Sequence, residues 1–221
     1  MLSNTKRTEI KKGAHKASFD RNHLEQIIDE SLIAHIAIHD EQGPIVIPML
    51  AWRVNNYVYI HGAQNSRLMR QLQQSHHTCL TFTLFDGWVL AKSAFHHSAH
   101  YRSAIVLGKF EPVHDAHEKD ALLNHFIEQI APGRTQDIRL SSQRELAATM
   151  LLKIPLTEAS VKISCHGVRD EKHDLDRPVW SGVLPYRTIV GPLQPEKVNS
   201  NIAVPDYSQA YEARWFSNVQ I

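Results

Sequence analysis

The sequence predicts a mainly β protein, built as a small antiparallel barrel with α-helices over its openings. In about the first 115 of the 221 residues, six short β-like runs are separated by turn signals, which is the rhythm of such a barrel. The pattern then becomes helical, with apolar residues three or four positions apart. It returns to strand in "LLKIPL" and "ASVKISC", a suitable last pair to close the barrel.

The predicted elements of the first half follow one another at short intervals. Asp20 is a typical N-cap residue for a helix that reaches about Leu32. The strand runs "LIAHIAIHD", "PIVIPMLAWRV" and "YVYIHGA" come next, and Asn55-Asn56 suits a tight hairpin because asparagine tolerates positive φ. A short helix, "SRLMRQLQQ", precedes three further strand runs, "TCLTFTLFDG", "WVLAKSAF" and "RSAIVLGKFEPV".

Two capping patterns mark the helices of the second half. Asp115 stands three residues before Glu118, and Ser142 stands three residues before Glu145. From Pro185 onward the chain is rich in Pro, Asn and Ser and shows little periodicity. We therefore predict a flexible N-terminal arm over residues 1–18, one barrel domain over 19–184 and an extended tail over 185–221, lying on the body or on a partner.

The composition excludes several classes of protein. A formal net charge of +1 gives no electrostatic reason to expect binding to nucleic acid or to a membrane surface. No apolar run approaches the length of about 18 residues that a membrane span needs. The two cysteines fall in strand-like runs and are expected to be free thiols, which favours a cytoplasmic protein.

The stretch "HGAQNSRL" combines the features of a phosphate site. A strand ends at His61, Gly62 allows the backbone a close turn, and a helix begins near Ser66 and Arg67. Backbone N–H groups at a helix N-terminus carry partial positive charge, to which a hydroxyl and a guanidinium are added here. A serine cap followed by a surface arginine explains the same residues, so both interpretations stay open.

The stretch "FHHSAHYRS" raises the question of a metal site. His96 and His100 have i,i+4 spacing, but the glutamate of the HExxH zinc motif is missing and no cysteine or carboxylate lies nearby in sequence. We therefore predict no metal site. Arg102 and Ser103 begin a strand, so their side chains should point to opposite faces, and only one can enter a given pocket directly.

A third stretch, "RPVWSGVLPY", places Trp180 before a serine and a glycine in a short apolar strand. An indole in this position offers a flat surface to a flat ligand, whereas a tryptophan packed in the core explains the same pattern.

Together and in this order, these stretches resemble the FMN-binding split-barrel proteins related to pyridoxamine 5′-phosphate oxidase. The closest branch is similar to the flavin-nucleotide-binding and nitroimidazole-resistance proteins. The resemblance runs from about Ala17 to Pro185, and the block from Asp86 to Gly108 is its most specific part. It implies a six-stranded antiparallel split barrel that forms a homodimer, with one flavin in each of two grooves between the subunits.

The resemblance also implies which residues contact the flavin. The strand containing Ile47 would lie along the ring, His61, Gly62, Ser66 and Arg67 would hold the phosphate, and the β-strand start at Arg102 would close over the phosphate and ribityl chain. The implied cofactor-binding residues are Pro48, Met49, Leu50, His61, Gly62, Ser66, Arg67, Arg102, Ser103 and Trp180.

The function implied is that of a small-molecule oxidoreductase using FMN, with FAD as an alternative cofactor and NAD(P)H as a reductant. His96, His97 and Tyr101 are candidates for proton delivery, although ordinary hydrogen bonding in the loop explains them equally well. A flavin carrier or sensor without turnover and a haem-binding split barrel are the alternatives. Oxidation of pyridoxamine phosphate is disfavoured, because Leu68 replaces a second basic residue and the tail lacks the Arg-x-His segment of those oxidases.

Overall fold

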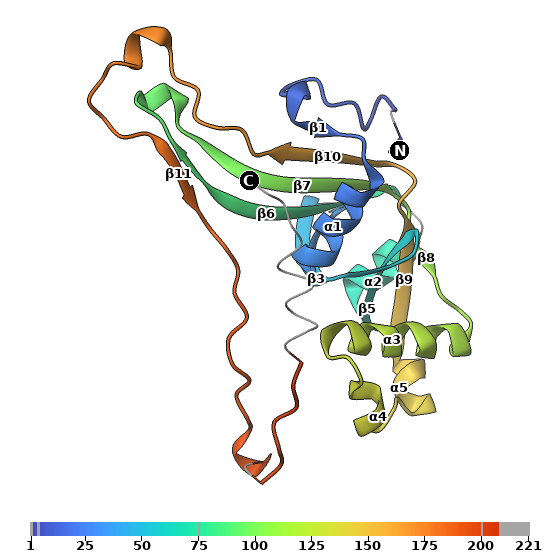
Figure 1. The fold of residues 1–221 in the computed structure, drawn as a ribbon. Helices are drawn as coiled ribbons and strands as arrows, with labels where there is room; N and C mark the ends of the chain where they lie inside the picture. Colours follow the sequence, from blue (N-terminus) through green and yellow to red (C-terminus); the bar gives the residue numbers. More distant parts are fainter. Residues whose placement is uncertain (1, 4, 75, 200, 208–221) are drawn as a thin grey trace.

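Two antiparallel sheets carry the fold, which a computed structural model describes for residues 2–3, 5–74, 76–199 and 201–207 (Figure 1). Among these residues, the larger sheet has seven strands. Its order is β1 (Ala17–Ser18), β10 (Ala159–Ser164), β7 (Ser98–Gly108), β6 (Thr78–Leu90), β2 (Ile33–Asp40) and β3 (Gly43–Leu50), with β11 (Gly182–Pro185) also paired to β6. The four-stranded sheet has the order β4 (Trp52–Val54), β5 (Tyr57–Ala63), β9 (Thr149–Pro155) and β8 (Glu111–Pro112). The prediction of a mainly β protein is confirmed.

The chain passes from one sheet to the other at Ala51. The sequence predicts one strand across "PIVIPMLAWRV", but β3 ends at Leu50 in the larger sheet and β4 begins at Trp52 in the smaller one. Ala51 is buried, and its N–H donates to the carbonyl of Leu32 at 3.0 Å instead of continuing either ladder. Ala51 belongs to the larger hydrophobic cluster and Trp52 belongs to the smaller one, so the two sheets can diverge.

Strand β6 is longer than predicted. The runs "TCLTFTLFDG" and "WVLAKSAF" were expected to be separate strands around Gly87, but β6 continues through a bulge between Phe85 and Gly87. Gly87 has φ 154°, and a Cβ atom there would lie 2.7 Å from the carbonyl oxygen of Leu184 on β11. The glycine therefore marks a bulge with a close backbone approach, not a hairpin turn.

The helices begin where the capping residues predict. Asp20, Ser66 and Asp115 each accept a hydrogen bond from a backbone N–H of the first turn, and Ser142 and Glu145 form a complete capping box. The helices are α1 (Arg21–Ser31), α2 (Arg67–Gln73), α3 (Ala116–Ile130), α4 (Arg134–Asp137) and α5 (Gln143–Ala148). In the part of the chain that the structure describes, no helix is both long and apolar enough to cross a membrane. Asn55 has φ 52° in the β4–β5 turn, which confirms the predicted hairpin.

The interior has two hydrophobic clusters. The larger one packs α1 against both sheets and includes the fully buried Leu24, Ile60 and Phe82. The smaller one joins the outer face of the four-stranded sheet to α3, with Trp52 and Phe126 at a ring-centroid distance of 4.7 Å. Helix α3 therefore closes one side of the small sheet, as Figure 1 shows.

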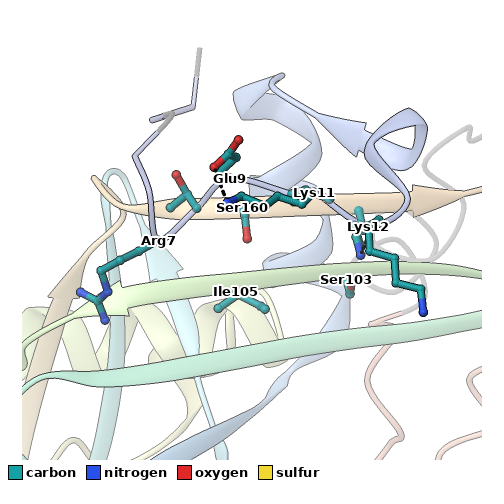
Figure 2. A pocket seen from close by; sticks show the side chains of 10 residues that line it. Arg7, Glu9, Lys11, Lys12, Ser103, Ile105 and Ser160 are labelled. Carbon is teal, nitrogen blue, oxygen red and sulfur yellow. Dashed lines mark hydrogen bonds and ion pairs between the residues drawn. The ribbon is translucent and has the colours of Figure 1, made fainter.

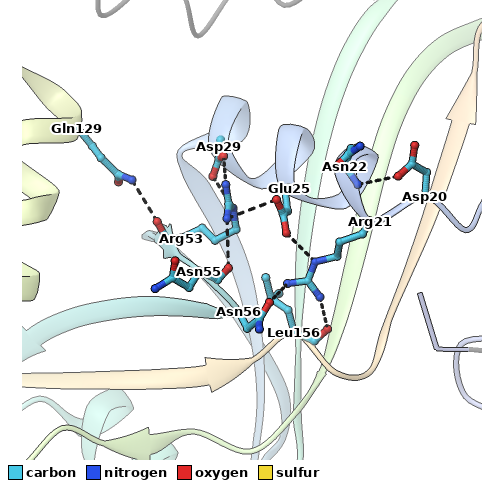
Figure 3. Close-up of polar contacts among 10 residues, drawn as sticks. All are labelled: Asp20, Arg21, Asn22, Glu25, Asp29, Arg53, Asn55, Asn56, Gln129 and Leu156. Atoms are coloured by element: carbon cyan, nitrogen blue, oxygen red, sulfur yellow. Dashed lines mark hydrogen bonds and ion pairs between the residues drawn. The ribbon is translucent and has the colours of Figure 1, made fainter. Parts of the chain in front are cut away.

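A chain of charges joins α1 to the β4–β5 hairpin (Figure 3). Arg53 donates to both carboxylate oxygens of Asp29, at 3.0 and 2.6 Å, and lies 3.6 Å from Glu25. Glu25 also accepts from Arg21 at 2.8 Å, and Arg21 donates to the side chain of Asn56 at 3.1 Å. These contacts fix the helix across the seam between the two sheets.

The two terminal segments differ in how they meet the body. The arm predicted over residues 1–18 runs along β10, with Leu2 in the larger core and β1 paired to β10. Beyond β11, residues 186–198 and 201–206 are exposed, and the chain runs away from the body as far as the short helix η4 (Lys197–Asn199), where it turns back (Figure 1). The segment "AYEARWFSNVQI", used above to disfavour the vitamin B6 reaction, lies outside the described residues.

The close approach at Gly87 gives a test of the β6–β11 pairing. We expect Gly87→Ala to lower the free energy of unfolding by about 1–3 kcal/mol, because the methyl group would overlap the backbone of Leu184. Urea denaturation measures the loss, and hydrogen exchange at Val183 should become faster. Gly167→Ala is the matched control, since a Cβ there meets no atom within 4 Å. Equal stability of the two variants would contradict the close approach.

Candidate functional site

Strand β7 begins at Ser98, before the start predicted at Arg102, and it sends Arg102 and Ser103 to opposite faces of the larger sheet, as alternation along a strand predicts. Arg102 lies on the inner side, next to Glu30 of α1 and Asp86 of β6. Ser103 lies on the outer side, where it pairs across the sheet with Lys162 of β10. Only Ser103 can therefore contact a ligand on the outer face.

The Arg102 guanidinium is occupied by two carboxylates. It donates to both oxygens of Asp86 at 2.9 Å and to Glu30 at 2.7 Å, and its side chain is only 14% exposed. Burial would lower the pKa of Arg102, but the hydrogen bonds to Asp86 and the charges of both carboxylates raise it above its ordinary value. The group stays charged and holds α1 against the β6 bulge. Its expected contact with a flavin phosphate stays a prediction.

A groove of about 250 Å³ lies on the outer face, between the N-terminal arm and strands β7 and β10 (Figure 2). Its lining combines hydroxyl groups, basic side chains and two isoleucines. The lining residues are Arg7, Thr8, Glu9, Ile10, Lys11, Lys12, Ser103, Ile105, Ser160 and Lys162. Of the residues predicted to bind a cofactor, Ser103 is the one that lines it.

The predicted phosphate turn lies at the end of β5. A Cβ atom on Gly62 would lie 2.9 Å from Met69, so the glycine allows α2 to pack closely. Ser66 caps α2, and the side chain of Arg67 is 74% exposed with Asp40 3.9 Å away. The guanidinium of Arg67 is thus accessible to an anion, which would compete with the long ion pair to Asp40, and the hydroxyl of Ser66 is shared with the helix cap.

His61 lies in an aromatic cluster instead of in the turn itself. Its ring centroid is 5.6 Å from that of Trp52 and 5.5 Å from that of Phe126. Burial lowers the pKa of His61, and its Nδ1 atom is buried without a hydrogen-bond partner among the described residues. The imidazole is therefore neutral at physiological pH and does not offer a positive charge to a phosphate.

The predicted flavin strand forms an edge of the larger sheet. Side chains alternate along β3, with Pro48 and Leu50 exposed and Met49 packed against the core. Because β3 is the last strand in the described order, its outer backbone groups are available to a planar ligand. This geometry fits a contact made through the backbone.

The loop between β6 and β7 carries the candidates for proton delivery. Nδ1 of His96 is hydrogen-bonded to Ser93 Oγ at 2.7 Å, and its Nε2 faces the carboxylate of Glu171 at 3.6 Å. The exposed His97 donates from Nδ1 to the carbonyl of Ser93 at 2.9 Å. Tyr101 lies beneath the ammonium group of Lys16, which is 5.4 Å from the ring centroid.

Trp180 is 68% exposed, so it is not a core residue in this chain. A Cβ atom on Gly182 would lie 2.5 Å from its indole ring, which shows that the ring lies across the start of β11.

The described residues contain no group of three His, Cys, Asp or Glu side chains that could hold a metal ion. His100 is buried on β7 and donates from Nε2 to the carbonyl of His166 at 2.7 Å.

Sequence reasoning missed the part of the groove that the N-terminal arm forms. Residues 1–16 contain five basic residues and one acidic residue, an excess that could have indicated an anion site. The segment lacks helical or strand periodicity, and we therefore expected only a flexible arm.

Comparison with known proteins places this geometry in a family. The family model described as pyridoxamine 5′-phosphate oxidase matches residues 20–163. The flavocytochrome Anf3 from Azotobacter vinelandii is 30% identical over 93% of this chain and 96% of its own, with a TM-score of 0.88. An FAD and haem binding protein from Mycobacterium smegmatis is also 30% identical, over 88% of this chain and 96% of its own, with a TM-score of 0.82.

A candidate 5-nitroimidazole antibiotic resistance protein from Bacteroides thetaiotaomicron is 25% identical over 66% of this chain and 86% of its own, with a TM-score of 0.56. Among proteins of curated function, no sequence matches this chain significantly. The split-barrel fold and the branch that the sequence resembles are thereby confirmed.

The buried guanidinium gives a stability test. We expect Arg102→Met to lower the free energy of unfolding by about 3–5 kcal/mol, because the buried Glu30 and the partly buried Asp86 would lose their common partner. Denaturation in urea measures the change. Arg144→Met is the control, because Arg144 is exposed and should contribute no more than about 0.5 kcal/mol. A loss at position 102 no larger than at position 144 would show that the cluster does not support the fold.

Proposed function

We propose, because the chain belongs to the pyridoxamine 5′-phosphate oxidase family, that it is a homodimeric flavoprotein oxidoreductase. The observation that carries this proposal is the likeness, over almost the whole chain, to two proteins whose names include a flavocytochrome and an FAD and haem binding protein. FMN and FAD are both candidates for the cofactor. A cytoplasmic location is part of the same proposal.

The chain offers separate groups for the ring and for the phosphate of a flavin. The edge backbone of β3 around Met49 is suited to the ring, and the exposed Arg67 is suited to the phosphate. Trp180 adds an exposed aromatic surface. When bound, the flavin supplies the transfer of two electrons from NAD(P)H to a small molecule, and the protein orients it and shields it from water.

The proposed phosphate contact can be tested by affinity. We expect Arg67→Ala to weaken FMN binding by about tenfold or more, through loss of a charge-assisted contact. Fluorescence quenching of FMN titrated with the purified protein gives the dissociation constant. Arg70→Ala is the matched control, since Arg70 is an exposed arginine of the same helix. Unchanged FMN affinity in Arg67→Ala would remove this contact from the proposal. Reduction by NAD(P)H no faster than that of free FMN would instead indicate a carrier or sensor.

Haem binding is a second candidate function, favoured by the geometry of His97. Since a carbonyl can only accept, the contact with Ser93 leaves the proton on Nδ1 of His97 and a lone pair on Nε2. A histidine held in this way is suited to bind haem iron. The exposed Phe95, Leu175 and Trp180 belong to the same end of the molecule, where Lys92 joins the two loops through the carbonyl of Leu175.

This second function predicts a difference between two neighbouring histidines. We expect His97→Ala to abolish the Soret band of protein reconstituted with haem, and His96→Ala to retain it, because Nδ1 of His96 is bonded to Ser93 and its Nε2 faces the carboxylate of Glu171. Absorption spectra of both variants at equal haem loading make the measurement. A Soret band unchanged by His97→Ala would exclude this ligand, and failure of the unmodified protein to take up haem would exclude the function.

A further inference from the structure

The chain leaves the body after β11, runs out to η4 and turns back (Figure 1). Tyr186 is its last contact with the sheet, where its N–H donates to a carbonyl of β6 at 2.9 Å. We call the exposed residues 187–198 and 201–206 the extension. In the described part of the chain, no hydrogen bond or ion pair joins the extension to the body before Asp206. The extension therefore has a course that its own body does not fix.

The extension is apolar for a segment that faces solvent. Its aliphatic side chains are between 45% and 90% exposed, and they are Ile189, Val190, Leu193, Val198, Ile202 and Val204. Single exposed apolar residues are ordinary, but a group of them in one segment marks a surface that another molecule covers. Long segments with little secondary structure are also uncommon in compact domains unless they carry a function.

The extension is shared with a relative. The match to the flavocytochrome Anf3 covers 93% of this chain, and the uncovered remainder is shorter than the extension. Part of the extension therefore has a counterpart in that protein. A segment that recurs in a relative without contacts to its own body is suited to a contact with a neighbouring chain.

The body carries an exposed surface of matching chemistry on β3. Side chains alternate along this strand, and those that face solvent are Pro44, Val46, Pro48 and Leu50. Ile33 of β2, the cross-strand partner of Leu50, is also exposed and continues this surface. We call these five uncharged residues the β3 strip.

Prolines lie in both surfaces, and they limit how the two can meet. The strip contains Pro44 and Pro48, and the extension contains Pro192, Pro195 and Pro205. Because proline has no N–H to donate, neither surface suits a regular β ladder. A contact between them would use side chains, and it would leave the edge backbone of β3 to the flavin proposed above.

We propose that the extension of one copy of this chain lies on the β3 strip of a second copy. The proposal rests on the homodimer of the proposed function. Within a single chain both surfaces are exposed, whereas two copies related by a two-fold axis can cover both extensions and both strips. The extension alone has nearly as many residues as one side of a standard interface, which is about 20–30. Each copy therefore supplies enough surface for a stable dimer.

The test measures the dissociation constant of the dimer by sedimentation equilibrium of the full-length protein. We expect Ile189→Ser/Val198→Ser on the extension and Val46→Ser on the strip each to weaken dimerisation at least fivefold, because apolar surface would no longer be covered. Ile130→Ser/Leu140→Ser is the matched control, since it removes two exposed aliphatic residues that belong to neither surface. All these side chains are exposed in the single chain, so each variant should keep its fold, which circular dichroism checks.

Combining the changes of the extension and the strip shows whether the two surfaces meet. Side chains that touch each other in the dimer share one contact, so the triple variant should dimerise little more weakly than the weaker of the two separate variants. A loss equal to the product of the two separate losses would mean that the surfaces act independently, and it would overturn the proposal.

The results also separate this contact from the proposed function. A dimer that the extension variant leaves intact, or an equal loss in the control, would overturn the contact and leave the homodimer standing. An unmodified protein that is monomeric would contradict the homodimer and the contact together. Dimerisation that depends on the extension, in a protein that binds neither FMN nor FAD, would support the contact and contradict the flavoprotein.

Discussion

The burial of the Arg102 guanidinium decides which face of β7 is available to ligands. A buried charge must be paired, and Arg102 meets this requirement with Asp86 and Glu30 on the inner side of the sheet. Because side chains alternate along a strand, the position of Arg102 forces Ser103 outward and fixes the register of the whole strand. A slip by one residue would place the guanidinium on the outer face and remove it from the buried Glu30 and the partly buried Asp86. The outer groove thus depends on a contact that lies on the other side of the sheet.

The cluster of Arg102, Glu30 and Asp86 also helps to hold the two sheets together through helix α1. Asp86 stands at the β6 bulge, and Glu30 stands in the last turn of α1. On the same helix, Asp29, which directly precedes Glu30, and Glu25 bind Arg53 of the small sheet. Helix α1 therefore presents carboxylates to both sheets. These contacts fix the position of the two sheets relative to each other where they diverge at Ala51. A split barrel needs such a bridge because no backbone ladder crosses between its sheets in the described residues.

Much of the fold could be predicted because its signals are local. Asp20, Asn55 and Ser142 act through bonds to residues two or three positions away or through their own φ, so the sequence is sufficient to identify them. The continuous β6 strand could not be predicted, because Gly87 is explained by a neighbour almost one hundred residues later in the chain. The break at Ala51 likewise depends on two separate cores. The resemblance supplied the family and the opposite directions of Arg102 and Ser103 followed from strand geometry, but pairing with Glu30 required the tertiary structure.

Positive charge is concentrated in the N-terminal arm. The chain as a whole has a formal net charge of +1, while residues 1–16 alone carry a net charge of +4. The rest of the chain is therefore slightly acidic, and the arm is where positive potential is concentrated. Arg7 and Lys11 of this segment are paired with Glu158 and Glu9, and the segment is fixed at Leu2 and at β1, with the carbonyl of Lys12 accepting from the lysine of β10. The hydrogen bonds from Thr5 and Arg7 to Glu158, and from Lys162 to the carbonyl of Lys12, hold this basic segment on the sheet. The position of the positive charge is therefore set by specific contacts of the fold and not by net charge alone.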